Sequence, residues 1–260
     1  MPDIRPIDPA SHAGMGFAPS PDYLHTRARD RVPLLIAEIP TALMVYPLAF
    51  AEADGRLRLV AVLGLRAGQN DCLGAGGRWR TGYVPSALRA WPFAPLAGED
   101  GTVTPGFDHD SGLWRDAPDP GRGEQRFFEI DGQPGEQLTK VAEFLRQCAA
   151  NQAITDTAVG ELQRADILVP WRFPEALSGD APPEGLLRVD QTALNALDRT
   201  ALARLRDANA LSVAYAQIFS VPRLRILAGL REIGDGQDPH GAQKAGAFVD
   251  DVGDFSFDLD

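Results

Sequence analysis

An Asp-Gly pair between two apolar runs places the tightest constraint on how this chain folds. Asp54-Gly55 follows a run that ends at Phe50, and a second run extends from Leu57 to Leu63. Asp-Gly in this setting favours a tight turn joining two antiparallel strands, because the turn needs left-handed backbone that these residues tolerate. We therefore expect paired antiparallel strands at about residues 44–51 and 57–65.

The hydrophobic period becomes helical after residue 135. Apolar side chains then recur at steps of three and four residues: Leu138, Val141, Ala142, Leu145 and Cys148. This spacing places them on one face of an amphipathic helix, which we expect over about residues 136–162. The helix has one apolar face to bury, so we expect it to cover the sheet.

The C-terminal third predicts two short strands followed by helices. Residues 167–171 are typical of a strand ended by Pro170, and residues 186–189 of another. Asp190 can cap the helical stripe that follows, which breaks at residues 207–209. The predicted fold is α+β: an antiparallel, hairpin-built sheet in the N-terminal half, covered by the central helix and a C-terminal helical subdomain.

Composition divides the chain into three parts. Residues 1–30 are rich in Pro, Gly, Ser and charge without a sustained period, which predicts a mobile N-terminal arm. Residues 31–233 are expected to form a single α+β domain. Residues 234–260 are expected to be a disordered acidic and aromatic tail, since residues 231–260 hold eight acidic and two basic side chains.

Charge and cysteine content exclude several classes of protein. The net charge of −11 argues against nucleic-acid binding and against docking on anionic membranes. No stretch approaches the ~20 apolar residues of a membrane helix, and no secretory signal is visible, so we expect a cytoplasmic protein without membrane insertion. Cys72 and Cys148 lie in different contexts and are expected to be free, reduced thiols.

Sequence motifs give little support to a known chemistry. The chain has no P-loop, no GxGxxG, no GxSxG and no HExxH, so we expect no cofactor and no metal. Asp108-His109-Asp110 is the one dense cluster of metal-ligating residue types. Such a run either chelates a metal or serves a general base, or is simply a solvated turn.

Two other features allow both a structural and a functional interpretation. Glu38 lies inside an apolar run and needs a partner if it is buried; Arg66 or Arg89 could supply an ion pair, and the alternative is a catalytic acid. Four aromatic residues within fifteen positions form either a packed core or a binding cleft: Trp79, Tyr83, Trp91 and Phe93.

Two separated blocks of residues resemble the SapC family, which is named for a gene linked to a bacterial surface layer. The resemblance covers roughly residues 30–231, outside the arm and the tail. The first block includes Val32-Pro33-Leu34, Glu38, Tyr46-Pro47, Leu63-Gly64-Leu65-Arg66, Asn70, Gly77-Arg78-Trp79, Tyr83-Val84-Pro85, Arg89 and Pro92-Phe93. The second includes Leu194-Asn195-Ala196-Leu197, Ala210-Leu211, Tyr215-Ala216 and Ser220. Trp91 and Asn209 depart from the pattern, which has Tyr and Gly there.

The resemblance implies an accessory role in surface-layer or cell-surface protein export or assembly, and it implies no catalytic residues. We therefore expect a non-enzymatic bacterial protein that binds a peptide or protein partner. The predicted binding residues in the domain are Glu38, Arg66, Asn70, Trp79, Tyr83, Arg89, Trp91 and Phe93. The alternative is an enzyme that modifies a peptide or small molecule through Glu38, Arg66, Asn70, Arg89 or the Asp108-His109-Asp110 cluster.

The last fourteen residues alternate acids with apolar side chains. Three phenylalanines punctuate the segment 247–260: Phe248, Phe255 and Phe257. Acids keep such a segment extended, while spaced aromatic rings can enter pockets of a basic partner. We expect these rings to anchor a partner; the alternative is weak packing on the chain's own domain.

Overall fold

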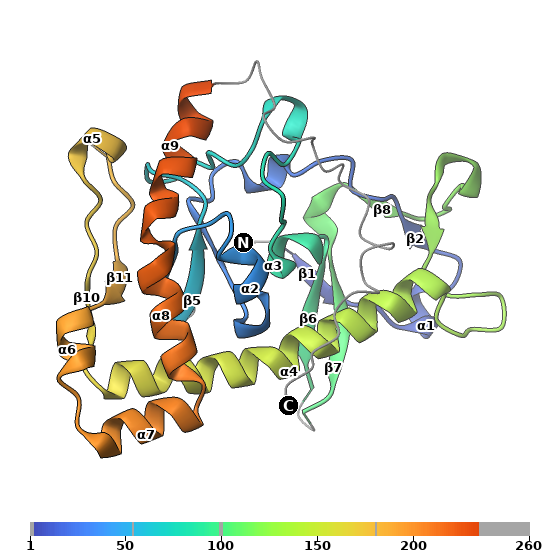
Figure 1. The fold of residues 1–260 in the computed structure, drawn as a ribbon. Coiled ribbons are helices and arrows are strands. Elements are labelled where there is room, and N and C mark those ends of the chain that lie inside the picture. Colours follow the sequence, from blue (N-terminus) through green and yellow to red (C-terminus); the bar gives the residue numbers. More distant parts are fainter. Residues whose placement is uncertain (1–2, 54, 99–100, 180, 234–260) are drawn as a thin grey trace. The chain divides into compact units, whose positions relative to one another are not determined.

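The computed structural model describes residues 3–53, 55–98, 101–179 and 181–233 (Figure 1). Their contacts divide the chain into two compact units. Among the described residues, the first unit holds residues 3–22, 89–98 and 101–150, and the second holds the remainder. Residues 3–22, within the expected N-terminal arm, therefore share a unit with residues 89–98 and 101–150.

The first unit contains two small antiparallel sheets with strand orders β1-β7-β6 and β8-β2-β9. The strands of the first sheet are β1 (Ile4–Pro6), β7 (Val103–Asp108) and β6 (Phe93–Ala97). Those of the second are β8 (Trp114–Arg115), β2 (Gly16–Phe17) and β9 (Gln125–Arg126). The short helices are α1 (Pro9–His12), η4 (His109–Ser111) and η5 (Pro120–Arg122).

Elements inside residues 1–30 have no local sequence signal. Ile4 pairs with Asp108, and Gly16 pairs with both Arg115 and Arg126. Strands of two or three residues are too short to show a period, and their partners lie about a hundred residues away in the chain. Phe17 is buried and stacks on Phe127 with ring centroids 5.4 Å apart.

The second unit is built on a five-stranded antiparallel sheet with the order β10-β11-β4-β5-β3. Its strands are β10 (Leu168–Pro170), β11 (Leu186–Val189), β4 (Leu48–Ala53), β5 (Arg56–Val62) and β3 (Arg31–Pro33). Before and between these strands lie η1 (Leu24–Thr26), η2 (Ile36–Glu38), α2 (Ile39–Ala42), η3 (Ala75–Gly77), α3 (Ser86–Arg89) and α5 (Glu175–Ser178).

The predicted hairpin is present, with its strands displaced from the expected bounds. Phe50 pairs with Leu59 across β4 and β5. Residues 44–46 instead complete the turn after α2, where the Tyr46 N–H donates to the Ala42 carbonyl. Beyond the end of β5, the Leu63 N–H donates to the Asp30 carbonyl and continues the pairing with the chain before β3.

Helices supply the rest of the framework. The predicted central helix is α4 (Glu136–Arg164). Its buried apolar side chains before residue 150 belong to the core of the first unit, and those after it belong to the core of the second unit. The C-terminal helices are α6 (Gln191–Asn195), α7 (Arg199–Asp207), α8 (Ala210–Ser220), η6 (Val221–Arg223) and α9 (Leu224–Ile233). Asp190 caps α6, as expected, by accepting from the backbone N–H groups of Thr192 and Ala193. The protein is therefore an α+β structure with antiparallel sheets, a long central helix and C-terminal helices. No helix in the described ranges is both long and apolar enough to span a bilayer.

Candidate functional site

Glu38 is held by neutral donors rather than by an arginine. The residue is 1% exposed. Its Oε1 accepts from the Tyr83 hydroxyl (2.6 Å) and the Ser86 N–H (2.7 Å). Its Oε2 accepts from the Ser86 hydroxyl (2.8 Å) and the Leu35 N–H (2.9 Å). The predicted ion pair with Arg66 or Arg89 is wrong, because four hydrogen bonds replace the solvation of this carboxylate. Glu38 links the start of α2 to Tyr83 and to Ser86, the first residue of α3.

The predicted aromatic residues are divided between the two cores. Trp79 is fully buried in the second unit, where its indole N–H lies 2.8 Å from the Tyr46 hydroxyl. Phe93 is 6% exposed in the core of the first unit. Tyr83 and Trp91 are half-buried, in the second and first units respectively. These four residues are therefore parts of two packed cores.

The remaining predicted polar residues of the domain have separate surroundings. Asn70 is 6% exposed; its amide donates to the Thr26 hydroxyl (3.0 Å), and its Oδ1 accepts from the Cys72 N–H (3.0 Å). Arg66 is exposed. The Arg89 guanidinium lies 5.3 Å from the centre of the Phe144 ring. Asn70 thus organises the loop after β5.

The Asp108-His109-Asp110 cluster is a capped turn. The Asp108 carboxylate accepts from the Asp110 N–H (3.1 Å) and so caps η4, while the His109 ring stacks on Trp114 with centroids 4.3 Å apart. Burial is the main cause that lowers the pKa of His109, which favours the neutral imidazole. Within the described ranges, no three His, Cys, Asp or Glu side chains are grouped to hold a metal ion.

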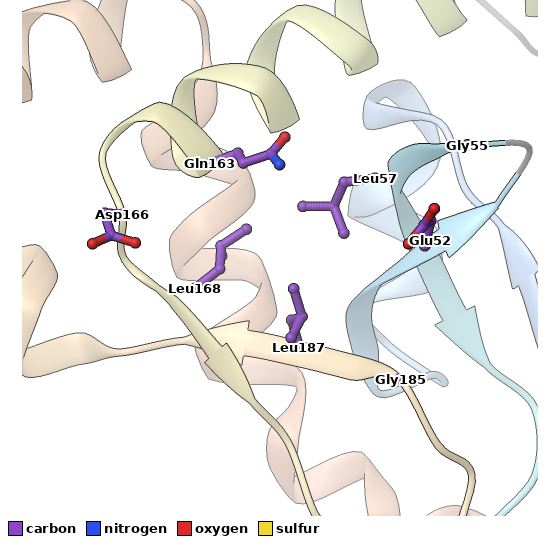
Figure 2. A pocket seen from close by; sticks show the side chains of 8 residues that line it. All are labelled: Glu52, Gly55, Leu57, Gln163, Asp166, Leu168, Gly185 and Leu187. Atoms are coloured by element: carbon purple, nitrogen blue, oxygen red, sulfur yellow. The ribbon is translucent and has the colours of Figure 1, made fainter.

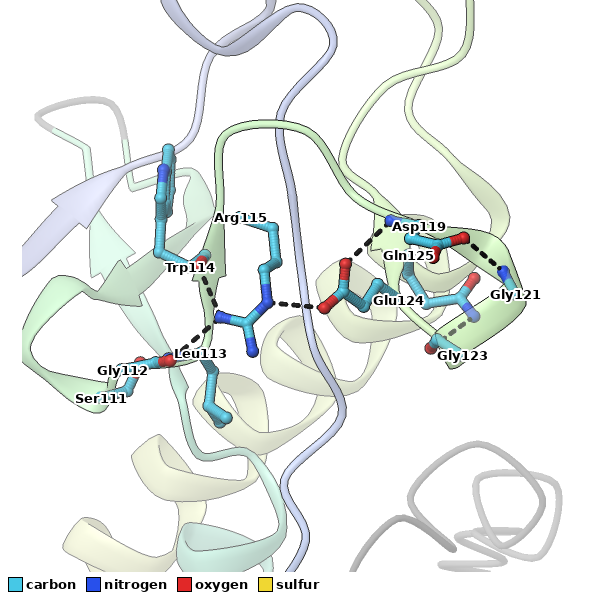
Figure 3. A network of polar contacts seen from close by, with 10 residues as sticks. All are labelled: Ser111, Gly112, Leu113, Trp114, Arg115, Asp119, Gly121, Gly123, Glu124 and Gln125. Atoms are coloured by element: carbon cyan, nitrogen blue, oxygen red, sulfur yellow. Dashed lines mark hydrogen bonds and ion pairs between the residues drawn. The ribbon is translucent and has the colours of Figure 1, made fainter.

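A second polar network in the first unit closes the loop between β8 and β9. Figure 3 shows the Arg115 guanidinium donating to Glu124 (2.6 Å), whose other oxygen accepts from the Asp119 N–H (2.8 Å). These two donors hold the pKa of Glu124 below its ordinary value, the Asp119 N–H contributing most. Every bond of this network links neighbouring parts of one loop, so its role is structural.

The second unit has an acidic cavity of about 500 Å³ at the β4–β5 turn. Figure 2 shows three leucines, Leu57, Leu168 and Leu187, with the carboxylates of Glu52 and Asp166 beside them. The leucines are half-buried and pack on the core. This composition gives an apolar surface edged by negative charge.

A basic groove of about 430 Å³ lies where β10 and β11 meet the start of α9. The lining residues are Pro170, Trp171, Arg172, Pro174, Arg188, Val221 and Leu224. The Trp171 N–H donates to the Leu186 carbonyl (2.8 Å), which extends the β10–β11 pairing past Pro170. In Figure 1, β10 and β11 are the two legs of a long hairpin with α5 at its tip.

Charge and apolar surface are combined in this groove. Trp171 and Leu224 are 6% and 5% exposed, so they form its apolar lining close to the core. Arg172 and Arg188 are exposed. Arginines are the only titratable side chains in the lining, and a guanidinium stays protonated at all relevant pH values. The groove can bind an anion beside an apolar group, but it has no side chain for general acid–base catalysis.

Of the site residues predicted from the sequence, none of those that the structure describes lines either cavity. The pattern at 167–171 and 186–189 predicts both strands correctly, yet the groove also needs residues 221–224, which follow three helices later. No local signal links these segments. The available sequence hint of a basic groove is a pair of arginines in the two strand segments: Arg172 beside Trp171, and Arg188 within the apolar run at 186–189.

Comparison with known proteins gives one match. The SapC family profile matches residues 7–227, a range that starts earlier than the resemblance over residues 30–231 and includes α1, β2 and η1. No curated protein and no solved structure matches the chain. Because the match covers well over half of the sequence, the chain belongs to the SapC family.

Proposed function

We propose that this protein is a non-enzymatic binding protein that holds an acidic, extended segment of a partner protein in the basic groove. The observation that carries the proposal is the composition of the groove: two exposed arginines beside an apolar surface formed by Trp171, Leu224 and two prolines. Carboxylates of a bound segment would meet Arg172 and Arg188, and its apolar side chains would lie on the surface between them.

A peptide fits this groove better than a substrate undergoing chemistry. Reaction sites bring together several different polar groups, such as a nucleophile, a base and an oxyanion donor. The groove offers guanidinium groups alone. The enzymatic alternative also loses support because Glu38 and Asn70 use their side chains in hydrogen bonds that hold the fold.

The family supplies the setting of the proposal. A role in surface-layer or cell-surface protein export or assembly would require this chain to hold a client segment, and we place that step in the cytoplasm. Phe248, Phe255 and Phe257 lie outside the described residues; we propose that segment 247–260 contacts a partner separately.

Charge reversal in the groove tests the proposal. The probe is a fluorescein-labelled peptide of alternating glutamate and leucine, titrated with the full chain and followed by fluorescence anisotropy. Arg172→Glu and Arg188→Glu should each weaken binding about tenfold, or ~1.4 kcal/mol. Binding should also weaken as salt rises, because exposed charges are screened.

The matched control is Arg204→Glu, which reverses an exposed arginine on α7, outside the groove lining. It should leave the affinity within about twofold. Equal losses of peptide affinity in all three variants would show that the net charge of the protein, and not the groove, determines binding. Unchanged binding in both groove variants would refute the proposal.

A further inference from the structure

A set of three arginines adjoins one buried carboxylate at another place in the second unit. The carboxylate is Asp71, which is 4% exposed. Arg66 follows Leu65, whose N–H donates to this carboxylate (2.8 Å), and the N–H of Arg80 donates to the carbonyl of Cys72, the residue after Asp71 (2.9 Å). Arg231, Arg66 and Arg80 all act electrostatically on it, opposing the burial that raises the pKa of Asp71. The set therefore carries three positive charges and one negative charge, a net charge of +2 when Asp71 is ionised.

Asp71 does not neutralise these arginines directly. Its Oδ2 accepts from the Leu65 N–H (2.8 Å) and its Oδ1 from the Gln69 amide (3.1 Å). Arg66, Arg80 and Arg231 are absent from the ion pairs formed among the described residues. The carboxylate is thus turned to loop donors, and no carboxylate among residues 3–53, 55–98, 101–179 and 181–233 forms an ion pair with these three arginines.

Arg80 is the buried member of the set. It is 4% exposed, and its Nη2 has no hydrogen-bond partner among the described residues. A Cβ on Gly74 would lie 2.9 Å from Cγ and Cδ of Arg80, so the missing side chain leaves room for this arginine. Burying a charged donor without an acceptor is costly, so a bound anion that supplies an acceptor would stabilise this arginine.

Arg66 and Arg231 approach the same loop from different elements. Arg231, in the last turn of α9, donates to the Leu177 carbonyl (2.7 Å). A Cβ on Gly179 would lie 3.6 Å from Nη2 of Arg66. Arg66 is exposed and Arg231 is half-buried, so the set extends from solvent to the buried Arg80.

We propose that Arg66, Arg80 and Arg231 form a binding site for a phosphate group carrying two negative charges. Guanidinium groups bind phosphate oxygens through paired N–H donors, and a dianion balances the net charge of the set, whereas a single carboxylate balances half of it. The residues differ from those of the basic groove, so this site goes beyond the proposed function. The ligand is either free phosphate or a phosphate ester.

Calorimetric titration of the full chain tests the site, with inorganic phosphate, phosphoserine and acetate as probes at constant ionic strength. Phosphate and phosphoserine should bind at one site per chain, and acetate at least tenfold more weakly. Tighter binding of phosphoserine than of phosphate would indicate an ester ligand, and the reverse a free ion. Acetate binding as tightly as phosphate would overturn the proposal.

Substitutions of single arginines test where phosphate binds. Replacing the buried Arg80 can destabilise the fold, so Arg66→Gln and Arg231→Gln carry the test, each expected to weaken phosphate binding about tenfold. Arg204→Gln on α7 is the control and should leave it unchanged. Unchanged phosphate affinity in both variants, with folding verified by circular dichroism, would overturn the proposal. Arg66→Gln should leave acidic-peptide binding unchanged, which separates this site from the groove.

Discussion

At the scale of single residues, buried polar side chains of the second unit serve the fold. Glu38 connects the start of α2 with Ser86 through four hydrogen bonds from neutral donors. Three of these donors belong to Tyr83 and Ser86, about fifty residues further along the chain. A buried carboxylate in such a position is expensive to replace, because its removal leaves several donors without an acceptor.

Glu38→Gln should lower the free energy of unfolding by about 2–4 kcal/mol, since the amide turns a donor toward N–H and O–H donors. Urea denaturation of the purified chain measures the change. Glu52→Gln is the matched control, an exposed glutamate that should shift the value by less than about 0.5 kcal/mol. Equal stability of the Glu38 variant and the wild type would show that the four contacts contribute little.

The two cysteines should differ sharply in reactivity. The two are not joined by a disulfide; Cys72 is fully buried and Cys148 is half-buried. Burial raises the pKa of Cys72 far above its ordinary value, with Asp71 adding to the shift and Arg80 opposing it. At pH 8 a thiol reagent such as DTNB should modify one thiol quickly and the second only on unfolding. Cys148→Ser should abolish the fast phase; its persistence would contradict the burial of Cys72.

At the scale of elements, a helix completes the sheet of the second unit. β11 pairs with β4 at Leu186↔Ala51 and Leu187↔Phe50. Continued by two residues, the same register would place Val189 opposite Leu48. Gln217 of α8 takes this place: its Oε1 accepts from the Val189 N–H (2.9 Å) and its Nε2 donates to the Leu48 carbonyl (3.2 Å). The amide therefore substitutes for a backbone ladder where the strands diverge.

Gln217→Leu should lower the free energy of unfolding by about 2–4 kcal/mol, because it removes the partner of the Val189 N–H and of the Leu48 carbonyl. Gln217 itself is only 1% exposed. Gln152→Leu on α4 is the control: Gln152 is half-buried and its amide donates to Asp156 within the same helix. Denaturant unfolding compares the two. A smaller loss for Gln217→Leu than for the control would contradict the bridging role.

Local signals predicted elements well and their partners poorly. The Asp54-Gly55 pair predicts the β4–β5 hairpin, and the three- and four-residue period predicts α4. Asn209, with φ of 57°, lies at the predicted break between α7 and α8. The basic groove and the arginine set could not be predicted, because each joins segments separated by more than thirty residues. The prediction of an ion pair at Glu38 was wrong, because backbone N–H groups and hydroxyls bind its carboxylate instead. Such neutral donors leave no recognisable pattern in the sequence.

At the scale of the whole molecule, the chain passes between its two units more than once. Among the described residues, 3–22, 89–98 and 101–150 form the first unit around an aromatic core, and α4 contributes to both cores. The groove and the arginine set both belong to the second unit. The proposed binding sites therefore depend on one core, that of the five-stranded sheet.

Removal of residues 247–260 should leave this framework intact. The family match ends at residue 227, twenty residues before the deletion begins. Differential scanning calorimetry of the shortened chain should give a melting temperature within about 2 °C of the full chain, because we expect a segment outside the family match to add little to the stability of the matched domain. A fall of ten degrees would show that the segment belongs to a core, and its proposed role as a partner contact would be abandoned.

Hydrogen exchange tests the central claim, acidic-peptide binding in the groove, most directly. Amide exchange of the full chain is measured by mass spectrometry with and without a saturating peptide of alternating glutamate and leucine. We predict added protection in segments 168–174, 186–189 and 221–224, which contain the residues that line the groove, and its loss in Arg172→Glu. Protection confined to other segments, or identical protection in that variant, would contradict the account.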